Sequence, residues 1–177
     1  MKINDLRSQK IALGRAYVKN FNELFASHLA NVKEESAKDT TTRDMHAVSG
    51  KFSKARKELH DAYETEKYKL TIQEAPSVHT MYAAADYKQN LLLKDMNKRL
   101  EVEYDKLQEK LDSGKYNYFE REELKREYDT LKEKLRDGVY GEVDKFREMY
   151  FQALSKDNTA EIDKLENSLL SNLLSDI

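Results

Sequence analysis

The chain has 177 residues, enough for one domain, and 36% of them are charged, with 31 basic side chains against 33 acidic ones. The net charge of -2 gives no overall attraction to nucleic acid or to an anionic membrane. The absence of cysteine excludes disulfides, thiol catalysis and thiolate metal sites.

Apolar residues recur every three or four positions along almost the whole chain, which predicts an all-α fold. The first helix is expected over residues 4–33. Three further apolar residues, Val18, Phe25 and Leu29, widen its stripe, so we expect this helix to pack against more than one neighbour. The stripe itself consists of Leu6, Leu13, Tyr17, Phe21, Leu24, His28 and Val32.

Two more long helices are expected before residue 112. Thr41 and Asp44 give an approximate capping signal for the second helix, and Pro76 ends it. Ser77 can then cap a third helix that continues to Leu111. The three helices are predicted to form an antiparallel bundle over residues 1–112. The stripe of the second helix consists of Met45, Val48, Phe52, Ala55, Leu59 and Ala62.

A short internal repeat follows, in which residues 103–116 match residues 127–140 at nine of fourteen positions. Each copy has a Gly two residues before its end, and we predict that Gly114 and Gly138 both form left-handed caps that end helices. The repeat could be two similar helix ends or a duplicated helical hairpin. Residues 113–177 are therefore expected to form two or three shorter helices that cap the bundle or project from it. The predicted fold is an elongated antiparallel helical bundle.

The sequence contains no pattern that predicts catalysis or cofactor binding. Its five glycines include no phosphate-binding cluster, and its four histidines lack the spacing of a metal site. His28 lies on an apolar stripe and is expected to be a hydrogen-bonded core residue. We expect no enzymatic activity, catalytic residue, metal, cofactor or small-molecule substrate.

The last helix, opened by Asn158 with Glu161, carries the strongest candidate for a partner-binding surface. Its apolar residues cover about half of its circumference. The helix could fold back on its own bundle, or it could dock in a groove of a second copy or of another protein. The candidate partner-binding residues are Ile162, Leu165, Leu169, Leu170, Leu173, Leu174 and Ile177.

We interpret the chain as a non-enzymatic helical protein-interaction or assembly protein that self-associates. Its small size and its content of Lys and Asn also fit a phage or mobile-element assembly factor. It has no signal-type segment, no membrane-spanning run and no cysteine, so a cytoplasmic location is expected, or a virion-associated one for a phage protein.

The alternative function is nucleic-acid binding by the N-terminal part of the chain. Residues 1–70 carry 14 basic and 10 acidic side chains, a net charge of +4, whereas residues 71–177 carry a net charge of -6. A membrane-binding helical dimer is a third possibility. The candidate nucleic-acid contacts are Lys51, Lys54, Arg56, Lys57, Lys67 and Lys69.

Overall fold

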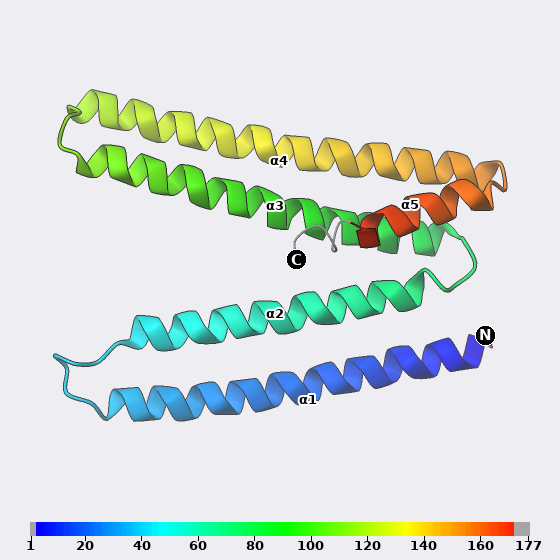
Figure 1. Cartoon of the computed structure of the whole chain (residues 1–177), viewed down its shortest axis with the longest axis horizontal. Helices are drawn as coiled ribbons and strands as arrows, with labels where there is room; N and C mark the ends of the chain where they lie inside the picture. Colours follow the sequence, from blue (N-terminus) through cyan, green and yellow to red (C-terminus); the bar gives the residue numbers. More distant parts are fainter. Residues whose placement is uncertain (1–2, 172–177) are drawn as a thin grey trace. The chain divides into compact units, whose positions relative to one another are not determined.

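The computed structural model describes residues 3–171, and all the regular structure in this range is α-helical (Figure 1). The predicted all-α fold class is therefore confirmed. Four of the helices are long and the last is short. They are α1 (Ile3–Ser36), α2 (Met45–Thr71), α3 (Val78–Asp112), α4 (Tyr118–Ser155) and α5 (Thr159–Ser171).

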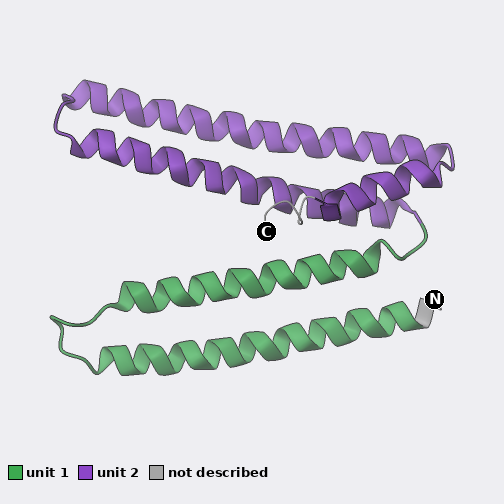
Figure 2. Cartoon of the chain, viewed as in Figure 1, with its two compact units in different colours: residues 1–75 green, residues 76–177 purple. Residues whose placement is uncertain are grey.

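The helices form two compact units, residues 1–75 and 76–177 (Figure 2). In the first unit α1 and α2 form an antiparallel hairpin. In the second unit α3 and α4 form another hairpin, and α5 packs on α4 and α3. The boundary expected at residue 112 falls in the turn between α3 and α4, inside the second unit, because α4 is long enough to be the antiparallel partner of α3.

Polar side chains at the helix starts explain where each of the last four helices begins. Asp44, and not Thr41, caps α2 by accepting a hydrogen bond from the Ala47 backbone N–H at 2.9 Å. Ser77 opens α3 and Asn117 opens α4, each within a reciprocal capping box. Asn158 accepts a hydrogen bond from the Glu161 backbone N–H at 3.2 Å and so caps α5. The predicted starts at Ser77 and Asn158 are confirmed.

The prediction for the two glycines of the repeat is right for one and wrong for the other. Gly114 has a φ of +69° and follows the end of α3, as a left-handed cap requires. Gly138 lies inside α4, so the helices expected on either side of it are one helix. Asn117 can start a new helix after Gly114, whereas no Ser, Thr, Asn or Asp lies within five residues after Gly138. The apolar stripe continues in phase through that glycine, with buried Val139, Val143, Phe146 and Tyr150.

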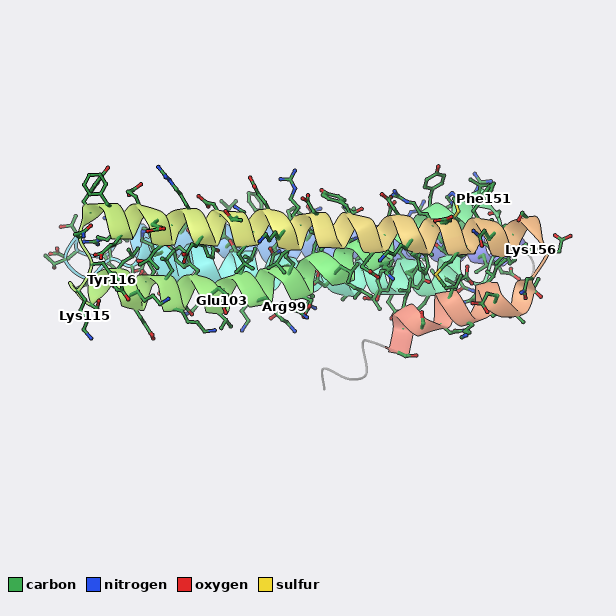
Figure 3. The ribbon with its side chains drawn as sticks, turned by 90° about the horizontal axis from the view of Figure 1, so that it is seen from above. Arg99, Glu103, Lys115, Tyr116, Phe151 and Lys156 are labelled. Atoms are coloured by element: carbon green, nitrogen blue, oxygen red, sulfur yellow. The ribbon has the colours of Figure 1, made fainter. Side chains whose placement is uncertain are left out.

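The two copies of the repeat lie on facing helices of the second hairpin. Tyr104 of α3 and Tyr128 of α4 occupy equivalent positions in the repeat, and their ring centroids are 5.8 Å apart. The copies run antiparallel from the turn that contains Lys115 and Tyr116 (Figure 3). The repeated stripe therefore serves as the packing face of both helices, and it marks a helix end only in its first copy.

Alanine substitutions at the two glycines should shift stability in opposite directions. Gly114→Ala places a Cβ on a residue with positive φ and should lower the free energy of unfolding by about 1 kcal/mol. Gly138→Ala adds a Cβ that meets nothing within 4 Å inside a helix, and should raise it by about 1 kcal/mol. Urea denaturation followed by circular dichroism measures both changes. A destabilising Gly138→Ala would contradict a continuous α4.

Candidate protein-interaction surface

The α1–α2 hairpin is held together along one face of α1. Tyr17 stacks on Tyr63 of α2 with ring centroids 4.5 Å apart, and His28 stacks on Phe52 with centroids 4.2 Å apart. At the open end of the hairpin the Lys10 ammonium lies 2.5 Å from the Glu74 carboxylate. The inner face of α1 is thus the first stripe predicted from the sequence. His28 lies in it as expected, although its Nδ1 is buried without a hydrogen-bond partner among the described residues.

Val18, Phe25 and Leu29, which widen the α1 stripe, are each about half exposed, although the Phe25 ring also contacts that of Phe52 in α2, with centroids 6.1 Å apart. Ile11, Val18, Phe25 and Leu29, which we call the outer stripe, are 48%, 56%, 44% and 53% exposed, respectively. One helix can cover only one face of another, so α2 leaves most of the second apolar face of α1 uncovered within the first unit, apart from the contact of Phe25 with Phe52. The second neighbour expected for α1 is therefore not supplied by its own hairpin. Apolar side chains aligned in this way are typical of an interaction surface.

A shallow hollow runs along the outer stripe from Ile11 to Glu23, and Gly14 lines it near its N-terminal end; Lys19 and Glu23 are also in its lining. The hollow is bordered by Ile11 and Val18, with Arg15 and Asn22 also in its lining. A Cβ placed on Gly14 would meet no atom within 4 Å. The hollow could accept a bulky apolar side chain from another molecule.

Charge along α1 is divided between its two ends. Residues 3–20 contain four basic side chains and one acidic side chain, and residues 21–36 contain one basic and three acidic side chains. Near the middle of the helix, Lys19 and Glu23 form an exposed ion pair at 3.9 Å. The N-terminal half of α1 is therefore basic and the C-terminal half is acidic by composition, although Glu35 pairs with Lys38, just beyond the helix, at 2.7 Å.

The candidate partner-binding residues of α5 pack inside the second unit. Ile162, Leu165 and Leu169 are buried, and Leu170 is half-buried. This arrangement is the fold-back alternative considered for this helix. Leu173, Leu174 and Ile177 lie outside the described residues. Docking of α5 on a partner stays a prediction, and it would require the helix to leave its own hairpin.

A buried polar cluster lies beneath α5. The Tyr150 hydroxyl of α4 donates a hydrogen bond to the Glu166 carboxylate of α5 at 2.5 Å, and it lies 2.9 Å from the Thr80 hydroxyl of α3. Burial raises the pKa of the Glu166 carboxyl group, and the nearby Asp163 adds to that increase. Burial and the Glu166 hydrogen bond also raise the pKa of Tyr150. The cluster joins three helices, and no sequence spacing indicated it because its members are 70 and 16 residues apart.

The candidate nucleic-acid contacts are all exposed on α2 but do not form one basic face. At about 100° per residue, Lys54 and Arg56 point about 160° apart. Lys67 and Lys69 lie 3.3 Å and 2.7 Å from the carboxylates of Glu64 and Glu66, which offset their charge. The six side chains of the set, Lys51, Lys54, Arg56, Lys57, Lys67 and Lys69, are therefore not gathered into a single stripe for a phosphate backbone.

The second hairpin exposes aromatic side chains that the sequence analysis did not single out. Phe119, in the first turn of α4, is 82% exposed and its ring contacts that of Tyr118. At the other end of α4, Phe151 is also exposed near Lys156, beyond which the chain turns into α5 (Figure 3). These residues interrupt polar surface at opposite ends of one helix, and they do not form a continuous stripe like that of α1.

Within residues 3–171, no group of three or more His, Asp or Glu side chains is arranged to hold a metal ion. In the same range, no helix is both long enough and apolar enough to cross a membrane. Searches of protein-family models, curated proteins and solved structures each gave no significant match to this chain.

Proposed function

We propose that this protein is a non-enzymatic assembly protein that associates with copies of itself through the outer stripe of α1. The observation that supports the proposal is the alignment of four large apolar side chains that stay about half exposed on α1, although one of them, Phe25, also contacts Phe52 of its own hairpin. Burying such side chains is the main driving force for helix association in water.

The expected affinity is moderate. Complete burial of one large apolar side chain contributes about 1.5–3 kcal/mol, and these side chains have about half of that left to gain. Association also has an entropic cost of at least several kcal/mol. We therefore expect a dimer that dissociates on dilution through the micromolar range, and not a permanent complex.

Light scattering coupled to size-exclusion chromatography tests this proposal. The wild-type mass should rise above 20.8 kDa as the protein concentration increases. Val18→Lys with Leu29→Lys places two charges in the outer stripe and should keep the chain monomeric, with its helix content unchanged. The matched control, Ala16→Lys with Ser27→Lys, adds the same charges at exposed positions on the opposite side of α1 and should behave like wild type.

A wild-type chain that remains monomeric at all concentrations would contradict self-association, and equal dissociation of both double variants would contradict the outer stripe as its site. The nucleic-acid alternative has a different signature. It predicts binding to DNA or RNA that weakens steeply with added salt and depends on the α2 lysines. Substitutions in the outer stripe should not affect such binding.

A further inference from the structure

We propose that two copies pair through antiparallel α1 helices, in the register that seats Phe25 of each copy in the Gly14 hollow of the other. The inference rests on the proposed function, because it specifies the geometry of the same surface. It is carried by three features of α1: the spacing of the outer stripe, the sizes of its side chains and the distribution of charge.

The spacing of the outer stripe is that of a helix-pairing seam. Ile11, Val18 and Phe25 are seven residues apart, and Gly14 follows Ile11 by three, as in a heptad pattern. The later positions of that pattern, Phe21 and His28, belong to the inner face of α1, where His28 stacks on Phe52 of α2. In an antiparallel pair, the register that sets Phe25 against Gly14 sets Val18 against the 21–22 segment of the other copy. It also sets Ile11 against Leu29 in the 28–29 segment, whereas Val18 faces Asn22 and the edge of the inner face at Phe21.

Side-chain size distinguishes this orientation from the parallel one. Phe25 is the largest side chain of the outer stripe, and Gly14 is the only glycine of α1. Antiparallel pairing places the largest group in the hollow left by the smallest. Parallel pairing in register would set Phe25 against Phe25 and Gly14 against Gly14, which brings two bulky rings together at one level and leaves a void at another.

Charge favours the same orientation. In an antiparallel pair the basic N-terminal half of each α1 lies beside the acidic C-terminal half of the other. In a parallel pair two basic halves and two acidic halves would lie side by side. Both the packing and the electrostatic arguments therefore select an antiparallel dimer.

Disulfide trapping tests the orientation directly, because the natural chain contains no cysteine. Two full-length variants, Ile11→Cys and Leu29→Cys, are mixed at equal concentration and equilibrated in a glutathione redox buffer. In the proposed register, each position lies more than about 25 Å along the axis from its own counterpart, which no disulfide can bridge. We expect disulfides between the two variants, and essentially none between identical chains.

The result separates the two proposals. If each variant forms disulfides with itself, the chains pair through α1 in a parallel orientation, so this inference fails while the proposed function stands. If neither combination is trapped although the chain dimerises, α1 does not pair in this way and the inference also fails. If the chain is monomeric under all conditions, both proposals fail.

The size of the residue at position 14 tests the register. Gly14→Leu should weaken dimerisation at least tenfold because Leu fills the hollow that receives Phe25, although Leu is the better helix former. Gly50→Leu is the matched control, since Gly50 also lies within a helix with no atom within 4 Å of its added Cβ. It should leave the dissociation constant unchanged. A Gly14→Leu chain that dimerises as well as the Gly50→Leu chain would overturn the register.

Discussion

Ile162→Ala is expected to destabilise the second unit by about 2–5 kcal/mol, among the largest effects of any single truncation in the described chain. Ile162 is 1% exposed and so is Val143 of α4, which belongs to the same core. Removing the side chain loses its burial and leaves a cavity between α5 and the hairpin. Hydrogen exchange of the α4 and α5 amides measures the loss, and it resolves the second unit from the first.

Phe119→Ala is the matched control for this truncation. It removes a larger side chain, but Phe119 is 82% exposed, so the change should cost no more than about 0.5 kcal/mol. Unchanged hydrogen-exchange protection of the α4 amides in the Ile162→Ala variant would show that α5 does not pack on its own hairpin. Docking of α5 on a partner would then be the favoured alternative.

Local chemistry made the helix starts predictable. The side chains of Ser77, Asn117 and Asn158 each accept a hydrogen bond from a backbone N–H three residues later, and this requirement is visible in the sequence. Glycine was a poorer guide, because a helix tolerates Gly138 when the apolar stripe continues in phase on both sides. The absence of a capping residue after Gly138 was the signal that could have identified α4 as one helix.

The pairing of the helices was not predictable in the same way. A wide apolar stripe on α1 indicates two neighbours, but it does not say whether both belong to the same chain. The apolar face of α5 is equally ambiguous as a predictor. It shows that the helix must pack in a groove, but that groove could belong to its own hairpin or to a partner. The Tyr150–Glu166–Thr80 cluster depends on three helices meeting, so it could not be found before the fold was known.

The second large effect on stability is expected in the Tyr150–Glu166–Thr80 cluster. Tyr150→Phe removes the hydroxyl that donates to the buried Glu166 carboxylate and should destabilise the second unit by about 1–3 kcal/mol at neutral pH. The Tyr150 hydrogen bond also lowers the pKa of Glu166, in opposition to burial. Its loss should therefore raise that pKa further and make the stability of the second unit more dependent on pH. Hydrogen exchange of the α5 amides at several pH values measures both effects.

The direction of the pH dependence follows from the raised pKa of Glu166. The folded state keeps the Glu166 proton over a range in which the unfolded chain, with a pKa of 4.5, has lost it. The contribution of Glu166 protonation to the free energy of unfolding is therefore greatest below about pH 4.5 and falls as the pH rises through the pKa of Glu166 in the folded state. Carboxyl groups with lowered pKa values, such as Glu35 and Glu122, act in the opposite sense, and their contribution is lost only as the pH falls below about 4.5.

Glu166→Gln isolates this contribution, because the amide can still accept the Tyr150 hydrogen bond but does not titrate. Subtracting its stability from that of wild type at each pH between 5 and 8 cancels the histidines, which titrate in the same range. The stability of the wild type should fall relative to that of Glu166→Gln as the pH rises through the folded pKa of Glu166, because only the wild type must bury a charge on α5. Parallel stability curves for the two proteins would mean that Glu166 is ionised to the same extent in the folded and unfolded chains, so that α5 does not bury it against α4.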